Sequence, residues 1–349
     1  MNDKAKEVTR ALVLSGGGGR GAYQAGVCRV LEEKGWRPDM VVGNSIGATN
    51  GAILLAPAAG GSGAQRLEQL WREKMHNEAM HQVAENWPGA LGKAIELVMK
   101  YLWHVQQAPE EAPRAELLQA LIEVLEEELA AVEGGALPAE GLAQKVLGRP
   151  ALLDRDGWHD LLAQEVDWSH LNDGAPYFGI MAADVTTGAP RLFWNRQPTG
   201  ASGHGTWLEV EHLMASSSIP AIYGATRINR RYCWDGFLCA NTPIAPALDA
   251  GATDIIAVLM TPWFPEAKGE GVAFTGEKPA IGDGLDRLLD WIMLSSFRSE
   301  LKRRKADQVV RIVAPRKLLG TLQYVDYGLQ DSARLIEHGV RDARRVLSD

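Results

Sequence analysis

Apolar residues and turn residues alternate along the first part of the chain in a pattern that predicts strands and helices in succession. Residues 10–14 form a short aliphatic run that ends in glycines, which is typical of a buried strand. Residues 21–35 then place apolar side chains at helical spacing and end at Gly35, a helix stop signal. A short strand at residues 40–42, a sharp turn and a helix beginning near Ile46 repeat the pattern. Two such units predict a parallel sheet covered by helices.

The middle of the chain has a different pattern, with longer stretches of helical spacing. Residues 91–105 place apolar side chains on one helical face, and residues 115–135 form a second amphipathic stretch with an acidic polar side. We predict that residues 80–148 form a helical insertion within a single domain spanning residues 1–349. We expect this insertion to act as a lid or to bind a partner, because its acidic side would repel an anionic membrane.

The alternation of strands and helices returns after the insertion. Residues 177–195 predict two strands around a turn at Thr187 and Gly188, and residues 208–219 predict a helix ended by Pro220. The remaining predicted elements are a strand, a tight turn, a helix at 243–250 and an apolar strand within residues 230–260, a helix at 283–305, a strand at 308–315 and a terminal helix. This order predicts an α/β fold with three layers, α/β/α, around a mostly parallel central sheet, with the helical insertion added to it.

Composition and charge narrow the class of protein. The 349 residues are 46% hydrophobic and 23% charged, which is ordinary for a globular protein. A formal net charge of −8 argues against a nucleic-acid partner. The three cysteines lack metal-type spacing, which favours reduced thiols in a cytoplasm. The apolar run near the N-terminus is too short for a signal peptide and no stretch is long enough to span a membrane, so we expect a soluble, cytoplasmic protein.

Four consecutive glycines at residues 16–19 follow the first strand. Gly16, Gly18 and Gly21 match the spacing of a dinucleotide-binding loop, but such a loop needs an acidic residue at the end of the second strand. Asp39 lies before that strand, at the wrong edge of the sheet. A Walker loop is excluded because it requires Gly-Lys followed by Ser or Thr, and a purely structural turn needs fewer glycines. Successive free N–H groups at a helix N-terminus favour an anion hole instead.

The second turn carries a candidate nucleophile. Gly43, Ser45 and Gly47 form the Gly-x-Ser-x-Gly pattern between an apolar strand and a helix. In a nucleophile elbow the two glycines permit a strained turn that raises the serine hydroxyl above the edge of the sheet. An ordinary Gly/Ser turn is the alternative. Both this turn and the glycine run follow parallel strands, and ligands bind at the carboxyl ends of such strands.

A serine nucleophile needs a proton acceptor. Only one of the eight histidines, His338, follows residue 212, and it lies in a polar helical stretch. His204 and His212 precede the acid candidate, whereas α/β-hydrolases place their histidine after the acid. His76, His81 and His104 belong to the helical region. Asp235 is the better candidate, because it follows an apolar strand and precedes Gly236 in a tight turn. An ordinary Asp-Gly hairpin turn is the alternative.

Three blocks of the chain carry a resemblance to a known family. They are GGGGRGAYQAGV at residues 16–27, GNSIG at 43–47, and ASSSIPAIY with WDGFLCANTPIAPALDAG between 215 and 251. In this order they resemble the patatin-like phospholipases, over residues 9–75 and 150–330. That family uses a glycine-rich oxyanion loop and a Ser–Asp dyad without histidine. Phe237 departs from its pattern, because the family has Gly or Ala at this position, which puts the turn geometry in question.

The resemblance implies a role for each matching residue. Ser45 would be the nucleophile and Asp235 the base. The residues of the oxyanion loop would be Gly16, Gly17, Gly18, Gly19, Arg20 and Gly21, those of the elbow Gly43 and Gly47, and that of the acid turn Gly236. The implied reaction is hydrolysis of a lipid acyl ester through an acyl-enzyme, without a metal or another cofactor. Two alternatives stay open: a histidine-dependent α/β-hydrolase and a catalytically silent lipid-binding or scaffold protein.

Contact with a lipid surface has modest independent support in the sequence. The tryptophans outside the predicted core strands are Trp87, Trp103, Trp158 and Trp168. Such side chains suit an interface with lipid, although they fill protein cores as well. Residues 91–105 could cap an acyl pocket or lie on a bilayer. A basic cluster consists of Arg298, Lys302, Arg303, Arg304 and Lys305. It could meet lipid headgroups, which leaves peripheral membrane contact open, or simply be a solvated helix face.

Overall fold

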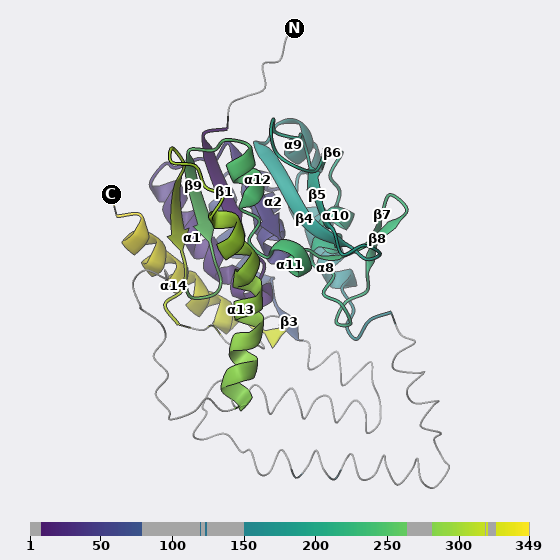
Figure 1. The fold of residues 1–349 in the computed structure, drawn as a ribbon. Helices are drawn as coiled ribbons and strands as arrows, with labels where there is room; N and C mark the ends of the chain where they lie inside the picture. Colours follow the sequence, from purple (N-terminus) through teal and green to yellow (C-terminus); the bar gives the residue numbers. More distant parts are fainter. Residues whose placement is uncertain are drawn as a thin grey trace.

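The computed structural model describes residues 8–78, 119, 123, 150–263, 281–317, 319 and 326–348 (Figure 1). Its strands are β1 (Arg10–Leu14), β2 (Met40–Asn44), β3 (Asn77–Glu78), β4 (Tyr177–Asp184), β5 (Pro190–Trp194), β6 (His204–Gly205), β7 (Thr226–Ile228), β8 (Arg231–Asp235), β9 (Asp254–Val258), β10 (Val309–Val313) and β11 (Asp326–Tyr327). Its helices are η1 (Gly18–Gly21), α1 (Ala22–Glu33), α2 (Ile46–Leu55), α3 (Gly63–Glu73), α8 (Asp156–Glu165), α9 (Trp168–Asp173), α10 (Val210–Ser216), α11 (Phe237–Ala240), α12 (Ala245–Asp249), α13 (Ile281–Leu301) and α14 (Leu329–Val346). The predicted insertion over 80–148 lies outside these residues, except for Gln119 and Glu123.

The central sheet has the strand order β10-β9-β1-β2-β4-β5-β6. The strands from β10 to β4 are all parallel, whereas β5 and β8 both pair with β4 in the antiparallel direction and β7 pairs with β8. β3 and β11 form a separate small sheet. Since parallel strands present their carboxyl ends at one edge, the turns that follow β1 and β2 lie side by side. The mostly parallel sheet of the sequence prediction is confirmed.

Helices cover both faces of the sheet, because successive side chains of a strand point to opposite sides. Leu12 and Leu14 of β1 belong to a core with α1, α3 and α14, whereas Ala11 and Val13 belong to a second core with α12 and α13. Figure 1 shows α1 and α14 on one side of the sheet and α12 and α13 on the other. The predicted three layers are therefore confirmed. Among the described helices, none is both long and apolar enough to cross a bilayer.

Several helix boundaries differ from the prediction. The helix expected at 208–219 is α10, which ends at Ser216, where Ser217 and Ser218 turn their hydroxyls back to the carbonyl of Met214. The helix expected at 283–305 is α13, which ends at Leu301. Two tighter turns follow it, because Arg303 N–H donates to the carbonyl of Glu300 and Arg304 N–H to that of Leu301. A side-chain hydroxyl or a three-residue turn replaces the helical ladder at both ends.

Candidate active site

Ser45 lies in the turn between β2 and α2 with a strained backbone. Its φ of 52° and ψ of −128° are unfavourable for a residue with a side chain. The flanking glycines allow this turn because side chains would clash: a Cβ on Gly43 would lie 2.6 Å from the N of Ala48, and one on Gly47 would lie 2.4 Å from the carbonyl oxygen of Leu14. The Gly-x-Ser-x-Gly pattern therefore has the backbone of a nucleophile elbow at the carboxyl end of a parallel strand.

A serine on a neighbouring element holds the elbow in place. The N–H of Ser45 donates to the Oγ of Ser216 at 2.7 Å, and the hydroxyl of Ser216 donates to the carbonyl of Met181 at 2.5 Å. Ser216 ends α10 and Met181 lies on β4. The turn that carries Ser45 is thus fixed to the sheet through α10, with its side chain in a buried site.

Asp235 ends β8 and faces the elbow. Its carboxylate accepts hydrogen bonds from the Nδ2 of Asn44 at 3.0 Å and from the N–H of Phe237 at 2.9 Å, and the neighbouring side chain of Ser45 acts to lower its pKa. Its own N–H donates to the carbonyl of Ser218 at 2.8 Å. The structure therefore brings Ser45 and Asp235 together from two strands that pair with the same edge of β4, where Asn44 lies opposite Met181 and Asp235 opposite Ala182.

The turn after Asp235 accommodates the phenylalanine that departs from the family pattern. Gly236 has ordinary helical torsion angles, φ −69° and ψ −7°, and Phe237 begins α11. A side chain at 237 therefore meets no backbone restriction. Position 236 does require glycine, because a Cβ there would lie 2.3 Å from the Oδ1 of Asn44 and 2.6 Å from the Cγ of Met181. The turn therefore excludes a side chain at position 236 and not at position 237.

Burial controls the protonation of Asp235. Loss of solvation raises the pKa of this carboxyl from 3.8 to about 6, although the polar groups of Phe237, Ser45 and Asn44 and the positive charge of Arg155 act in the opposite direction. A carboxylate with a pKa near 6 is ionised at neutral pH and is a stronger base than an exposed aspartate. This pKa suits an acceptor for the proton of a serine hydroxyl.

Arg155 is a partly buried cation behind the site that the sequence analysis did not identify. Its guanidinium donates to the carbonyl of Met214 at 2.8 Å and to the hydroxyls of Ser217 and Ser218 at 3.2 and 2.9 Å. It therefore braces the turn after α10, whose carbonyl at Ser218 holds Asp235. The serine run in this turn was part of the third sequence block, but nothing in the sequence linked it to an arginine 63 residues away.

The glycine run forms a loop directly beside the elbow. Gly16 is fixed by Asn241, because its N–H donates to the Asn241 carbonyl at 3.0 Å and its own carbonyl accepts from Asn241 Nδ2 at 3.2 Å. Asn44 Nδ2 also donates to Asn241 Oδ1 at 3.2 Å, which connects the loop, the elbow and Asp235. Among the described residues, the N–H groups of Gly17 and Gly18 have no backbone acceptor.

The side chain of Arg20 in this loop has a structural partner. It is fully buried, and its Nη1 donates to the Oδ1 of Asp290 on α13 at 2.7 Å. A carboxylate so close to the guanidinium makes the pair a buried salt bridge. Arg20 therefore connects the glycine loop to α13.

A small cavity opens beside Ser45. Its volume is about 50 Å³, and Gly18, Ser45 and Arg155 contribute to its lining. Its apolar wall is formed by Ile46, Trp158, Leu162, Met214 and Ile219. A mostly apolar wall with a few polar groups beside a serine suits an acyl group. Trp158, one of the tryptophans outside the predicted core strands, belongs to this wall.

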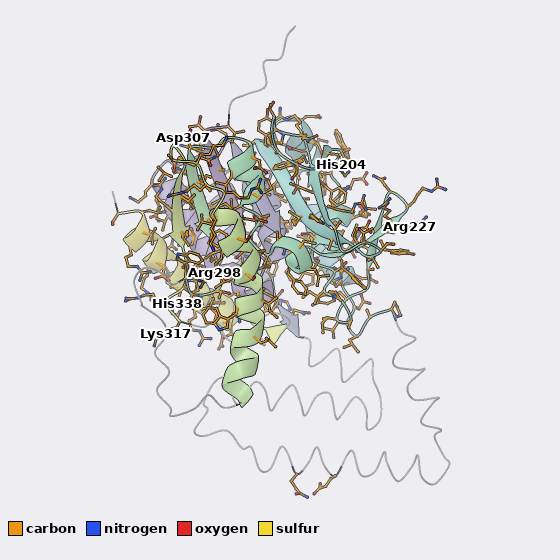
Figure 2. All side chains as sticks on the ribbon, in the orientation of Figure 1. His204, Arg227, Arg298, Asp307, Lys317 and His338 are labelled. Carbon is orange, nitrogen blue, oxygen red and sulfur yellow. The ribbon has the colours of Figure 1, made fainter. Side chains whose placement is uncertain are left out.

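Other candidates from the sequence have different positions. Asp39 accepts hydrogen bonds from the N–H groups of Thr9 and Arg10 at the amino end of β1, at the edge of the sheet opposite to the glycine loop. His212 caps α10 and packs against the ring of Phe193, at 4.9 Å between centroids. Figure 2 shows His204 and His338 on opposite sides of the fold. The described lining of the Ser45 cavity includes no histidine, and the described residues contain no cluster of three or more potential metal ligands.

Comparisons with known proteins gave one family match, a related sequence and similar structures. A sequence model described as patatin-like phospholipase matches residues 12–248. Over 68 residues the chain is 44% identical to lysophospholipase nte1 of Aspergillus terreus, a match that covers 18% of this chain and 4% of that protein. VipD from Legionella pneumophila aligns with a TM-score of 0.44 and 12% identity, over 98% of this chain and 67% of its own. ExoU in complex with SpcU, from the type III secretion system of Pseudomonas aeruginosa, aligns with a TM-score of 0.34 and 16% identity. This alignment covers 99% of this chain and 52% of that one.

The match to the family model covers more than half of the 349 residues. It extends from β1 to α12 and includes the glycine loop, the elbow and the turn at Asp235. The lysophospholipase match is local, since this chain corresponds to only a small part of that protein's length. The family that the three sequence blocks predicted is confirmed, and the chain belongs to the patatin-like phospholipase family.

Proposed function

We propose that this protein is a serine acyl hydrolase that cleaves lipid esters with Ser45 as nucleophile and Asp235 as base. The observation that carries the proposal is the buried carboxyl of Asp235 beside the side chain of Ser45, with the pKa of Asp235 raised to about 6. Family membership supports the reaction class, and the strained elbow supports the choice of nucleophile. A structural serine would need neither the strained turn nor a buried carboxylate beside it.

The proposed reaction has two halves. In the first, Ser45 Oγ attacks the ester carbonyl while its proton moves to Asp235. Collapse of the tetrahedral intermediate breaks the bond to the alcohol, which leaves with the proton from Asp235, and the acyl group stays on Ser45. In the second, water attacks the acyl-enzyme, Asp235 accepts the proton of the water, and the fatty acid leaves as Ser45 recovers its proton. Asp235 serves as base and acid in turn.

We assign stabilisation of the oxyanion to the N–H groups of Gly17 and Gly18. Gly18 lines the Ser45 cavity, whereas the N–H of Gly16 is already bonded to Asn241. Donors of this kind are fixed before the reaction and meet a charge that develops only in the transition state. Removing one such donor typically costs about 2.7–4 kcal/mol of transition-state stabilisation. The buried Arg20–Asp290 pair then keeps the loop in position.

The substrate class follows from the apolar wall of the cavity. Its volume of about 50 Å³ is small beside the roughly 300–1,000 Å³ of pockets that enclose a whole ligand, so it holds only a short part of an acyl chain. We therefore expect the described geometry to accept short-chain esters, and longer acyl chains to require the cavity to widen. A series of soluble esters with increasing acyl length measures this preference through kcat/KM.

Covalent labelling tests the proposed function directly. A fluorophosphonate probe is expected to modify the protein at Ser45, because a nucleophile with an adjacent base and anion donors reacts with such electrophiles. Peptide mapping identifies the modified residue, and the Ser45→Ala variant provides the control. Labelling that persists in Ser45→Ala, or that occurs at another serine, would contradict the assignment of the nucleophile.

Turnover should depend on pH with a limb on the acid side. The base must be ionised, and the pKa of Asp235 is about 6, so kcat/KM for a soluble ester should rise as pH increases through about 6 and then level off. Arg155 is the charged group that lowers this pKa. Arg155→Met should therefore move the limb to higher pH, because loss of the positive charge favours the neutral carboxyl.

Arg155→Lys serves as the matched control for this shift. Lysine keeps the positive charge but cannot replace all the hydrogen bonds that the guanidinium makes to the turn after α10. If Arg155 acts on Asp235 through its charge, the limb stays near the wild-type pH in Arg155→Lys and moves only in Arg155→Met. Equal loss of turnover in both variants without any displacement of the limb would assign Arg155 a purely structural role.

A further inference from the structure

Helix α13 has one buried face and one face with exposed large apolar side chains. The buried face consists of Asp290, Met293, Leu294 and Phe297. On the other face Leu288, Trp291 and Ile292 have exposed fractions of 53%, 39% and 52%. Single exposed apolar side chains are common, but three within five residues of one helix form a contiguous patch. Such a patch needs an occupant or a function.

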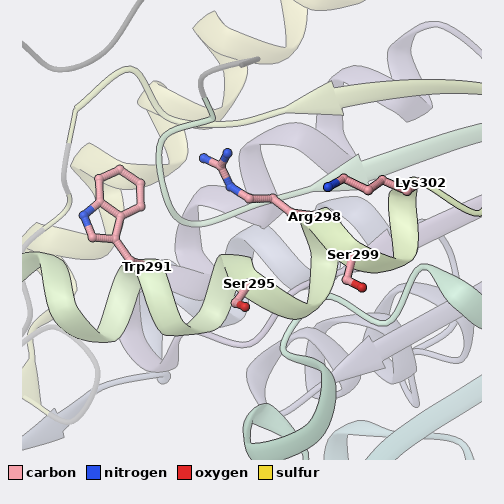
Figure 3. A pocket seen from close by; sticks show the side chains of 5 residues that line it. All are labelled: Trp291, Ser295, Arg298, Ser299 and Lys302. Atoms are coloured by element: carbon pink, nitrogen blue, oxygen red, sulfur yellow. The ribbon is translucent and has the colours of Figure 1, made fainter. Parts of the chain in front are cut away.

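Positive charges continue the same stripe toward the end of the helix. Trp291, Arg298 and Lys302 follow at helical spacing, and the three side chains lie along one hollow with Ser295 and Ser299 (Figure 3). The guanidinium of Arg298 lies 5.1 Å from the ring centre of Trp263. We call the stripe of Leu288, Trp291, Ile292, Arg298 and Lys302 the outer face of α13. It is apolar in its first half and cationic in its second.

The position of this face relative to the active site is fixed by buried contacts. Asp290, next to Trp291, accepts from Arg20 of the glycine loop at 2.7 Å and from the hydroxyl of Thr261 at 3.2 Å. The apolar half of the outer face is thus at the level of the loop that follows β1, at the carboxyl edge of the sheet. In Figure 1 the N-terminal end of α13 extends beyond this edge. Ser45 and the apolar half of the outer face therefore lie at the same edge of the sheet.

The charge of the face contrasts with that of the chain. The formal net charge is −8, yet Lys302, Arg304 and Lys305 are all exposed at the end of α13 and in the turn after it. A cationic patch on an acidic protein is complementary to an anionic surface. Exposed tryptophan and aliphatic side chains beside cations are typical of helices that lie in the interface of a bilayer.

We propose that the outer face of α13 is the surface by which this protein contacts a bilayer containing anionic phospholipids. Leu288, Trp291 and Ile292 enter the headgroup region, and Arg298 and Lys302 meet lipid phosphates. The inference rests on the proposed function in one respect: contact at this face would bring the edge that carries Ser45 to its lipid substrate. Its test does not depend on that function, because binding to vesicles is measured without hydrolysis.

Vesicle co-sedimentation of the full chain with the Ser45→Ala substitution tests the proposal. This background preserves the surface and leaves the vesicles intact. Binding to vesicles of phosphatidylcholine and phosphatidylglycerol is expected to exceed binding to phosphatidylcholine alone and to weaken at high salt. Trp291→Ala should lower the partition coefficient about tenfold, because a large apolar side chain no longer enters the interface. Lys302→Gln should lower it about fivefold on the anionic vesicles only.

A matched control is available elsewhere on the surface. Trp207 is 51% exposed and lies before α10, so Trp207→Ala removes a similar side chain from outside the outer face. It should bind vesicles like the parent protein. Equal losses in Trp291→Ala and Trp207→Ala, or no loss in either, would overturn the proposal. A dimer in the absence of lipid that Trp291→Ala dissociates would also overturn it, since the occupant would then be a second copy of the chain.

The two proposals can fail separately. With Ser45 intact, Trp291→Ala should hydrolyse a soluble short-chain ester at the wild-type rate and vesicle phospholipid more slowly, because it lacks only the contact with the bilayer. Loss of both activities would contradict a role confined to docking. If the wild-type protein hydrolyses no ester while Ser45→Ala still binds anionic vesicles through Trp291, the docking surface stands and the proposed function fails.

Discussion

Replacing Ser45 by alanine is expected to lower the turnover of a soluble ester by a factor on the order of 10⁵ or more, since no other group can form the acyl-enzyme. The strained turn should persist, because its constraints come from Gly43, Gly47 and the hydrogen bond to Ser216, none of which involves the hydroxyl. Ser202→Ala, at an exposed serine, provides the control and should retain full turnover. Normal turnover in Ser45→Ala would contradict the proposed mechanism.

Asp235→Asn should lower turnover by about 10²–10⁴-fold, because an amide cannot accept the serine proton. The substitution fits the site: the amide oxygen can accept from Asn44 and Phe237, as the carboxylate does, and the amide nitrogen can face Ser45. Loss of turnover would therefore report a missing base and not a distorted site. A variant with unchanged kcat and a raised KM would instead indicate that Asp235 acts in binding.

The same variant should gain stability at neutral pH. The folded pKa of Asp235 is about 6 and the ordinary value is 3.8, so this group favours folding below about pH 4 and loses that contribution as pH rises through 6. The difference corresponds to at most about 3 kcal/mol. Asparagine cannot ionise, so Asp235→Asn should be more stable than the wild type in urea at pH 8 and similar to it near pH 4. If the variant and the wild type had equal stabilities at pH 8 as well as at pH 4, burial of the ionised carboxylate would not destabilise the folded protein.

The parts of the site that the sequence predicted are those fixed by local constraints. Glycine at 43 and 47 is required because backbone atoms lie where side chains would be. The pattern around Ser45 can therefore be recognised from the sequence alone. At Gly236 it is the side chains of Asn44 and Met181 that lie where a Cβ would be. The short continuous apolar runs likewise predicted β1, β2, β4 and β9, since a strand buried on both sides leaves few polar choices.

The parts that the sequence did not predict depend on contacts between distant segments. Arg155 reaches the turn after α10 from a helix start 63 residues before Ser218, and nothing in its neighbourhood distinguishes it from a surface arginine. Asn241 holds Gly16 across 225 residues. Arg20 lies inside a recognised motif, but its partner Asp290 is 270 residues away. Pairings of this kind follow from the order of strands in the sheet, which one sequence does not specify.

Arg20→Met should destabilise the protein by about 3–5 kcal/mol, because it leaves the carboxylate of Asp290 buried without its cation. Both side chains of the pair are only 1% exposed, so water cannot replace the lost partner. Urea unfolding measures the change. The glycine loop should also lose its connection to α13, so the turnover of a soluble ester should fall together with stability.

A double variant tests whether the lost stability comes from the charge pair of Arg20 and Asp290. Asp290→Asn removes the unpaired charge, and Arg20→Met combined with Asp290→Asn should therefore recover a large part of the stability lost in Arg20→Met. The hydrogen bond from Thr261 to Oδ1 can be kept by the amide oxygen of asparagine. If the two substitutions instead add without coupling, the salt bridge does not hold the loop, and the position of Gly17 and Gly18 must depend on Asn241 alone. Recovery of stability with little recovery of turnover would show that the charge pair also sets the geometry of the loop, because a neutral pair can fill the site without orienting the glycines.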